Sequence, residues 1–418
     1  MRIAIPKETV ASEPRVAGTP DTVKRLKALG AEVAVEPGAG QASGIVDADF
    51  AAAGATLSAD AVRDADVVLK VRRPTAAEAA GYRRGAVVLA TMDPYGNEAA
   101  LAELARAGIC AFAMELMPRI TRAQVMDVLS SQANLAGYRA VIDAAAAFGR
   151  ALPMMMTAAG TVPAARIFVM GAGVAGLQAV ATARRLGAVV TATDVRPAAK
   201  EQVESLGAKF IAVMDDEFRQ AETAAGYAKP MSAEYQAKQA ALVAEHIAKQ
   251  DIVITTALIP GRPAPRLVTG AMVASMKPGS VILDLAVERG GNVEGARPGE
   301  VVTTANGVTI LGYLNMPGRL AATSSSLYAK NLLAFLEIMI DKSAKALNVP
   351  WDDELVKATL LTRDGAVVHP AFKDAVPVPA APAPSVEAPA SVPAPAAEAA
   401  AEADGSKRKA APKKTTKS

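Results

Sequence analysis

The sequence predicts an α/β protein with two Rossmann-like, doubly wound parallel-sheet domains joined by long helices, plus a disordered C-terminal tail. Two successive series of short apolar runs alternate with helical patterns, and a glycine-rich motif opens the second series. The composition then changes abruptly near residue 376. Strands that alternate with helices form parallel sheets that carry helices on both faces.

The first series begins at the N-terminus. A helix is expected over 19–31, ending at Gly30, and a long helix over about 123–149. The segment 61–74 is expected to supply the end of another helix and then a strand. Further strands are expected over 1–6, 32–37 and 85–92.

The second series contains strands expected over 165–170, 188–194, 208–213, 251–257, 280–286 and 307–313. A helix over 324–342 is expected to cross back to the first domain, because no run of strands follows it. We therefore assign residues 1–125 and 325–375 to a discontinuous first domain and 126–324 to a second domain with its linking helix. Residues 376–418 are assigned to a disordered Pro/Ala-rich linker and basic tail.

Composition limits the classes of partner. The net charge is +3, but six Lys and Arg side chains lie within 406–418, so the rest of the chain is near −3 and no nucleic-acid partner is expected. The single cysteine, Cys110, is typical of a reducing compartment. Neither a signal peptide nor a transmembrane segment is expected.

A dinucleotide-binding motif follows the strand over 165–170. The sequence "GAGVAG" places Gly171, Gly173 and Gly176 in the pattern G-x-G-x-x-G, and a helical pattern continues from it. The first glycine permits a tight turn, the second lets backbone approach a pyrophosphate, and the third lets helix pack on strand. The N-terminus of that helix offers amide groups to the phosphates.

Asp194 ends the next strand, at about the spacing of 20 residues expected for the carboxylate that binds the ribose hydroxyls. A carboxylate at this place repels a 2′-phosphate, so the pattern favours NAD(H) over NADP(H). Arg196 complicates this interpretation, because an arginine near that position can accept a 2′-phosphate.

The usual proton acceptor of a dehydrogenase is missing. Of the two histidines, His246 lies in a lysine-flanked helix and is expected at the surface, and His369 lies near the end of the folded part. No cluster of His or Cys has metal-ligand spacing, so no metal is expected. The deficit suggests hydride transfer that needs no proton transfer to substrate.

A polar segment begins the long helix. Gln124, Asp127 and Ser130 are spaced by three in apolar surroundings, and Arg119 precedes them. This spacing predicts one stripe on a helix. The stripe is either a solvated face or a hydrogen-bonding site.

Many stretches, in one order across about 1–372, resemble the alanine dehydrogenase/transhydrogenase family. They are "IPKE" (5–8), "RVAGTP" (15–20), "RAQVMDVLSSQANLAGYRAV" (122–141), "MMMTAAGTVPAARIFVMGAGVAGLQA" (154–179), "ATDVR" (192–196), "ETAAGYAK" (222–229), "TTALIPGRPAP" (255–265), "MKPGSVILDLAVERGGN" (276–292) and "LYAKNLL" (327–333). The chain departs from the alanine dehydrogenase branch at three places. Arg72 stands where that branch carries a substrate-binding Lys, the stretch 87–97 has no His, and Glu288 replaces an Asp. The resemblance therefore favours the proton-translocating transhydrogenase branch.

The resemblance implies roles for residues of this chain. Four residues would position the nicotinamide: Arg119, Gln124, Asp127 and Ser130. The other cofactor-binding residues would be Gly171, Gly173, Val174, Ala175 and Gly176 at the pyrophosphate, Asp194, Val195 and Arg196 at the adenosine ribose, Thr256, Ala257 and Leu258 near the nicotinamide ribose, and Gly226 and Tyr227 in a loop over about 218–233 that closes on bound nucleotide.

The resemblance also implies partners. This chain would bind NAD(H), and a separate beta subunit would bind NADP(H). Because the sequence ends without membrane helices, a small membrane alpha subunit is expected, with this chain as a homodimer docked peripherally on the cytoplasmic face. Two alternatives stay open: an NAD-dependent oxidoreductase like alanine dehydrogenase, and a nucleotide-sensing module that keeps only the fold.

Overall fold

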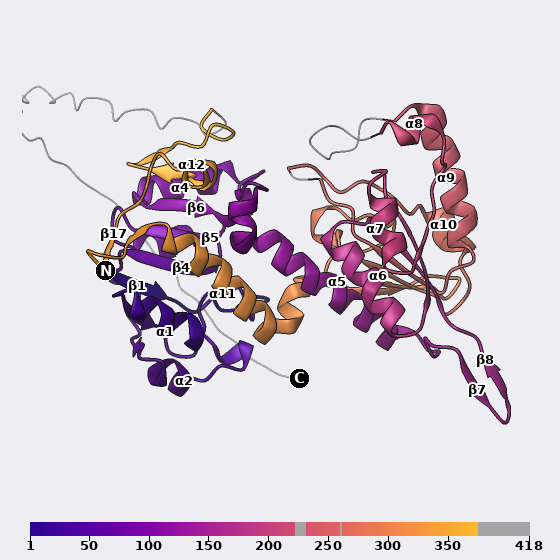
Figure 1. Ribbon diagram of the computed structural model, residues 1–418, viewed down its shortest axis with the longest axis horizontal. Coiled ribbons are helices and arrows are strands. Elements are labelled where there is room, and N and C mark those ends of the chain that lie inside the picture. Colours follow the sequence, from indigo (N-terminus) through magenta and orange to yellow (C-terminus); the bar gives the residue numbers. More distant parts are fainter. Residues whose placement is uncertain (222–230, 260, 375–418) are drawn as a thin grey trace, which may run out of the picture. The chain divides into compact units, whose positions relative to one another are not determined.

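The computed structural model describes residues 1–221, 231–259 and 261–374, and these contain two large parallel sheets (Figure 1). The expected loop residues Gly226 and Tyr227, and the tail over 376–418, lie outside the described residues. The α/β class with two Rossmann-like sheets is confirmed. The domain boundaries drawn from the sequence stay a prediction.

The first sheet has six strands in the order β3-β2-β1-β4-β5-β6, and every neighbouring pair is parallel. Its strands are β1 (Arg2–Ile5), β2 (Glu32–Val35), β3 (Thr56–Leu57), β4 (Val67–Arg72), β5 (Val87–Thr91) and β6 (Cys110–Ala113). The helices between them are α1 (Pro20–Ala28), α2 (Asp47–Ala52), α3 (Ala76–Ala80) and α4 (Glu98–Ala107). No helix precedes β4 over 61–66, where the sequence suggested a helix end; these residues form turns.

Local sequence explains why these elements form. Thr19 caps α1 through a reciprocal capping box with Thr22, and Pro20 occupies the first helical turn, where its missing N–H costs nothing. In β1, Ile3 and Ile5 face one buried cluster and Ala4 faces another, as the two-residue period of a strand requires. The first sheet is therefore buried on both faces.

A late segment completes the core of the first sheet. Helix α11 (Ala321–Glu337) contributes Tyr328, Leu332 and Phe335 to the cluster that contains Ile3 and Ile5. The expected return of this helix to the first sheet is thus seen in the packing. Beyond α11 come β16 (Ile340–Asp341), β17 (Ala346–Leu347), α12 (Glu354–Thr359), β18 (Thr362–Arg363) and β19 (Ala366–Val367).

The second sheet has the order β11-β10-β9-β12-β13-β15-β14, and all pairs are parallel except β14 with β15. Its strands are β9 (Arg166–Met170), β10 (Val189–Thr193), β11 (Lys209–Phe210), β12 (Ile252–Thr255), β13 (Val281–Asp284), β14 (Val301–Thr303) and β15 (Thr309–Leu311). Its helices are α6 (Val174–Arg185), α7 (Ala199–Ser205), α8 (Asp216–Arg219), α9 (Ala233–Ile247), α10 (Gly270–Ser275) and the 3-10 helix η4 (Val287–Arg289).

Helices cover both faces of the second sheet. Helices α6 and α7 share one buried cluster with β9, whereas α9 and α10 share the cluster on the opposite face (Figure 1). Both sheets change the direction of winding next to their first strand: β1 lies between β2 and β4, and β9 lies between β10 and β12. Crevices that bind ligands form at such switch points, outside the carboxyl ends of the strands.

The segment between the sheets differs from expectation. It holds two 3-10 helices, η2 (Met114–Leu116) and η3 (Thr121–Met126), and then α5 (Val128–Ala147). The chain leaves helical geometry at Asp127, with φ −75° and ψ 92°. The predicted single helix from 123 was therefore wrong in its first turn. Of the other 3-10 helices, η1 (Gln41–Ser43) follows β2, and η5 (Met316–Leu320) leads into α11.

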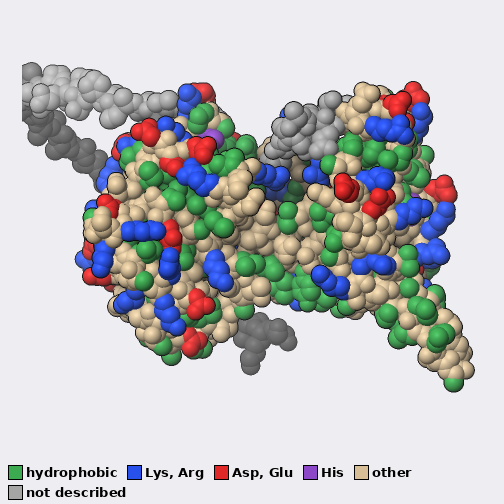
Figure 2. All heavy atoms as spheres, in the orientation of Figure 1, with side chains coloured by type: hydrophobic (Ala, Val, Ile, Leu, Met, Phe, Trp, Pro, Cys, Tyr) green, Lys and Arg blue, Asp and Glu red, His purple; other side chains and the backbone are tan. Residues whose placement is uncertain are grey.

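A hairpin of β7 (Met155–Thr157) and β8 (Gly160–Val162) leads into β9. Its Met154 and Met156 are 59% and 80% exposed, and hydrophobic side chains gather on this hairpin in Figure 2. Cys110 is buried at the start of β6, and burial raises the pKa of its thiol. Among the described residues, no helix is long and apolar enough to cross a bilayer.

Candidate functional site

The glycine motif forms the turn between β9 and α6. A Cβ atom on Gly176 would lie 1.8 Å from the carbonyl oxygen of Gly171, and one on Gly171 would lie 2.4 Å from Thr256 Oγ1. Gly171 also has φ +107°, which side chains disfavour. At Gly173, by contrast, an added Cβ meets nothing within 4 Å. Packing explains the glycines at 171 and 176, whereas Gly173 borders open space at the start of α6.

Helix α6 presents its N-terminus at this turn. Gly173 is the N-cap and offers no side-chain hydrogen bond, so the first amides of the helix are not capped by it. Val174 and Ala175 supply two of those amides. Uncapped amides and the positive end of the helix dipole together bind anions such as a pyrophosphate.

Asp194 lies at the end of β10 and is tied to the motif. Its carboxylate accepts a hydrogen bond from Ala172 N at 2.7 Å and from Arg196 N at 2.9 Å, and it pairs with the Arg196 guanidinium at 2.9 Å from Nε. Asp194 is nearly buried, whereas Val195 is exposed. The structure thus joins Asp194 directly to the glycine turn, and Arg196 neutralises it.

The end of β12 forms the third part of this cluster. Thr256 donates from N to Met170 O at 2.9 Å and from Oγ1 to Gly171 O at 3.1 Å. Asn292, which is fully buried, accepts from Ala257 N at 3.0 Å and donates to Ala257 O at 2.9 Å. This pair of bonds holds the backbone before the exposed Leu258. Sequence reasoning missed Asn292, although the stretch "GGN" carried a signal.

Of the four residues expected at the nicotinamide, Arg119 precedes η3, Gln124 lies on η3, and Asp127 and Ser130 lie at the start of α5. Asp127 is the N-cap of α5 and accepts from Ser130 N at 2.9 Å and Ser130 Oγ at 2.5 Å. Arg119 and Gln124 are exposed. The stripe is therefore not one helix face, because the chain turns at Asp127; spacing by three here reflects a cap and its partner.

Helix α5 connects these residues to the phosphate turn. A Cβ atom on Gly137 would lie 2.0 Å from Ala175 O, so the backbones of α5 and α6 touch there. Asn134 Nδ2 donates to Gln178 Oε1 at 3.1 Å nearby. The structure thus bonds Asp194 to the glycine turn at Ala172 and Thr256 to the same turn at Gly171, and it joins Asp127 and Ser130 to this turn through α5.

Neither histidine stands in this cluster. His246 is half-buried against Phe168 and bonds Thr191 Oγ1 through Nε2 at 2.8 Å, so the expectation of a surface position was wrong. Burial lowers the pKa of His246, and it likewise lowers that of His369. Within the described part of the chain, no three side chains of His, Cys, Asp or Glu gather as metal ligands.

Comparisons with known proteins agree with this geometry. The family models described as alanine dehydrogenase/PNT, N-terminal and C-terminal domains, match residues 4–136 and 140–370.

The chain belongs to the alanine dehydrogenase/PNT family.

Three relatives show how closely. The chain is 57% identical over 380 residues to the first of the polypeptides that form NAD(P) transhydrogenase subunit alpha in Rhodospirillum rubrum, covering 89% of this chain and 99% of that one. A crystal structure of transhydrogenase from Sinorhizobium meliloti matches with TM-score 0.81 and 66% identity, over 88% of this chain and all of that one. Alanine dehydrogenase of Halomonas elongata is 31% identical over 385 residues, covering 90% and 96%. Membership and the glycine turn together indicate an NAD-binding oxidoreductase.

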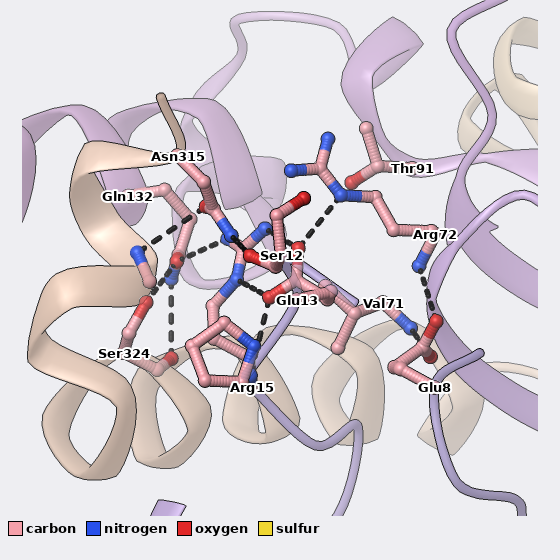
Figure 3. Close-up of polar contacts among 12 residues, drawn as sticks. Glu8, Ser12, Glu13, Arg15, Val71, Arg72, Thr91, Gln132, Asn315 and Ser324 are labelled. Atoms are coloured by element: carbon pink, nitrogen blue, oxygen red, sulfur yellow. Dashed lines mark hydrogen bonds and ion pairs between the residues drawn. The ribbon is translucent and has the colours of Figure 1, made fainter. Parts of the chain in front are cut away.

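The first sheet of this alanine dehydrogenase/PNT family member also has polar residues at its switch point (Figure 3). Glu13 accepts from Arg15 Nε and Nη2, both at 2.6 Å, and from Arg72 Nε at 2.7 Å. The Glu13 side chain is fully buried and that of Arg15 nearly so. Burial alone would raise the pKa of Glu13, but the bonds and charges of the two arginines outweigh it and lower that pKa.

A second ion-pair group adjoins it. Lys70, 1% exposed, lies 2.8 Å from Glu78 and 3.3 Å from Glu8, and Glu8 accepts from Val71 N at 2.7 Å. Sequence reasoning noted Arg72 as a replacement and missed the group that it joins. The cations and carboxylates at this switch point are thus bonded to one another.

Proposed function

We propose that this chain is the NAD(H)-binding subunit of a proton-translocating NAD(P) transhydrogenase. Bound NADH would supply a hydride directly to NADP⁺ held by a beta subunit, and this transfer would be coupled to proton translocation across the membrane. The observation that carries the proposal is the open space at Gly173, in a turn whose other two motif glycines are closely packed. Close approach of a pyrophosphate to the backbone accounts for that space.

The chain's residues divide the work of binding. The turn from Gly171 to Gly176, including Val174 and Ala175, would hold the pyrophosphate on amides of α6. Thr256, Ala257 and Leu258 would face the nicotinamide ribose from the end of β12. Gly226 and Tyr227, outside the described residues, are proposed to close over the nucleotide.

Asp194 would select NAD(H). Its carboxylate already accepts hydrogen bonds from Ala172 N and from the Arg196 side chain. Ribose hydroxyls would therefore donate to the same carboxylate oxygens beside Arg196, or would displace the Arg196 side chain from them. A 2′-phosphate would meet the same carboxylate and be repelled. The ion pair with Asp194 would keep the Arg196 guanidinium from binding a 2′-phosphate. The exposed Val195 would lie beside the ribose.

Arg119, Gln124, Asp127 and Ser130 would orient the nicotinamide carboxamide. Direct hydride transfer needs two rings held in near-attack geometry with water excluded, and it needs no proton acceptor on substrate. The Asp127–Ser130 cap gives this segment a fixed shape. The position of both histidines outside the cluster supports this chemistry over alcohol or amine oxidation.

The surroundings of that segment fit a protein partner. Ile120, Val125 and Leu129 are exposed apolar side chains, at 37%, 65% and 47%, on either side of Gln124 and Asp127. Apolar side chains at this place would help a docked NADP(H)-binding beta subunit exclude water. We define Ile120, Val125 and Leu129 as the apolar rim.

Further partners follow from the same proposal. The exposed methionines of the β7–β8 hairpin support a homodimer, in which a second copy covers them. A small membrane alpha subunit and the beta subunit would hold this chain at the cytoplasmic face of the inner membrane. We also propose the division into two domains at 125–126 and 324–325.

The test uses the full chain. Binding to the chain should change the fluorescence of NADH, and NADPH should show no such change. In a second experiment, addition of the beta subunit should allow NADH to reduce an NADP⁺ analogue. Failure of that reduction would defeat the proposal. NADH formation from L-alanine and NAD⁺ would instead support the alanine dehydrogenase activity, and a tight NADH site without any transfer would support a sensing module.

Asp127→Asn tests the orienting role. Asn caps a helix as well as Asp does, so α5 should remain intact while the charge is lost. Hydride transfer is expected to slow by about tenfold or more, with NADH affinity changed by less than about threefold. Stopped-flow transfer and NADH titration measure the two; equal losses in both would count against orientation.

A further inference from the structure

Helix α11 reaches the segment that carries Gln124, Asp127 and Ser130 with one buried amide. Asn331 is 7% exposed on a helix whose neighbouring side chains fill the core of the first sheet. Its Nδ2 donates to Val125 O at 2.8 Å, and its Oδ1 accepts from Ser131 Oγ at 2.7 Å. Both ends of the amide are therefore used on one short stretch of chain.

The two anchor points enclose the polar segment. Val125 follows Gln124 directly, and Ser131 follows Ser130 directly. Between them the backbone leaves η3 and enters α5 at Asp127. The last carbonyls of a helix lack partners within it, and Asn331 supplies one to Val125 at this break.

One side of the segment packs against α11, and the other side is exposed to solvent. Helix α11 lies beside the start of α5 (Figure 1), and the side chains of Val125 and Leu129 point away into solvent. Gln132 adds a second tie, because its Nε2 donates to Ser324 O at 3.2 Å and its Oε1 accepts from Arg15 Nη1 at 2.8 Å (Figure 3). Of these two ties, the one made by Asn331 reaches the backbone inside the segment.

We propose that Asn331 is a positioning residue for hydride transfer. Its amide fixes the backbone at Val125 and the hydroxyl of Ser131, and so sets the directions of Gln124 and Asp127 toward the nicotinamide. The inference rests on the proposed function. A small displacement of an orienting group costs rate far more than affinity, since only the reacting geometry demands it.

The central variant is Asn331→Leu, which keeps approximate volume and removes both bonds. Ser131 Oγ retains its contact with Val128 O at 3.2 Å, so the carbonyl of Val125 is the group that loses its partner. Asn331→Asp keeps an acceptor for Ser131 and loses the donor to Val125. Ser131→Ala removes only the hydroxyl tie.

Ser325→Ala is the matched control. Ser325 lies on the same helix and is fully buried; its Oγ accepts from Val16 N at 3.0 Å and bonds Ser43 Oγ at 2.8 Å. Its loss weakens the attachment of α11 through buried hydrogen bonds, as Asn331→Leu does, but away from the polar segment. A purely structural role of Asn331 would make the two variants alike.

The experiment measures NADH affinity, the rate of hydride transfer with added beta subunit, and amide hydrogen exchange over 124–131. Asn331→Leu and Asn331→Asp should slow transfer by about tenfold or more, with NADH affinity changed by less than about twofold, and Ser131→Ala should slow it less. The amides of the segment should exchange faster in Asn331→Leu than in Ser325→Ala, whose transfer rate should stay normal.

The proposal would be overturned by a normal transfer rate in Asn331→Leu, by equal losses of rate and affinity, or by a loss of rate in Ser325→Ala as large as in Asn331→Leu. Unchanged hydrogen exchange over 124–131 would also overturn it, whatever the rates. Absence of transfer in the unchanged chain with its partner would instead defeat the proposed function, while the exchange data still report whether Asn331 holds the segment.

Discussion

The two sheets wind alike, but their switch points hold opposite contents. Beside β9, the motif leaves open space at Gly173 and presents helix amides to it. Beside β1, Arg15 and Arg72 both donate hydrogen bonds to the buried carboxylate of Glu13. The same strand order thus leaves open space beside a motif glycine at one switch point and places paired charges at the other.

The strand order therefore predicts where a crevice can form, whereas the residues at that place determine whether it can bind a ligand. A switch point lined by backbone amides keeps hydrogen-bonding capacity for an outside group. A switch point lined by paired charges uses that capacity internally. The following variants test this contrast, from the largest expected effect to the smallest.

Glu13→Gln tests whether the paired charges at the first switch point stabilise the fold. The change leaves two guanidinium groups without their buried counter-charge, so it should lower the free energy of unfolding by about 3–5 kcal/mol. Chemical denaturation measures it. Glu337→Gln, which breaks the more exposed pair with Arg25, should cost at most about 1 kcal/mol. If Glu13→Gln lowered the free energy of unfolding no more than the control variant does, the buried charges would contribute little to stability.

Gly173→Ala tests the open switch point. The backbone there has φ −74° and an added Cβ meets nothing, so the fold should keep its stability. NADH affinity should fall by about a hundredfold, or about 2.7 kcal/mol, because the methyl group occupies space that the pyrophosphate needs. Isothermal titration measures the affinity. Gly176→Ala is the contrast, since its Cβ would meet Gly171 O and destabilise the turn itself.

Asp194→Asn should act on selectivity. The amide keeps one acceptor for Ala172 N but loses the charge that pairs with Arg196. NADH affinity should fall by about tenfold, and discrimination against NADPH should narrow. Parallel titrations with the two nucleotides measure the ratio. An unchanged ratio would remove Asp194 from cofactor selection.

His246 should give the smallest effect, on pH dependence alone. Burial, with nearby Lys249, Lys209 and Arg166, lowers its folded-state pKa below 6.5, so the unfolded chain binds more protons below that pH. Stability should therefore be full above 6.5 and decline as pH falls. His246→Gln should reduce this decline, as denaturation at about pH 7.5 and about pH 5.5 would reveal. If stability declined equally in the variant, another group would cause the loss of stability at low pH, and His369 would be the next residue to replace.

The sequence predicts what local pattern encodes. The glycine turn and Asp194 could be located because strand, turn and helix lie within one βαβ unit. The break at Asp127 was missed, although Asp is among the residues that most often cap the start of a helix. His246 was misplaced because flanking lysines indicate solvent only for the helix face on which they lie.

Contacts between distant segments could not be predicted. Gln132 bonds Arg15 across 117 residues, and Asn331 bonds Val125 across 206. Neither residue has a local pattern that names its partner, because a buried amide is stabilised by whatever the fold brings to it. The paired charges at the switch point of the first sheet could therefore be seen only in the structure.

Buried Cys110 makes the chain convenient for labelling. It is the sequence's one cysteine, and its raised thiol pKa leaves little reactive thiolate. A cysteine introduced by Val125→Cys on the exposed apolar rim would react first and carry a single dye without removal of the natural thiol. Binding of a partner at the apolar rim could then be followed in real time through a single fluorophore attached at residue 125.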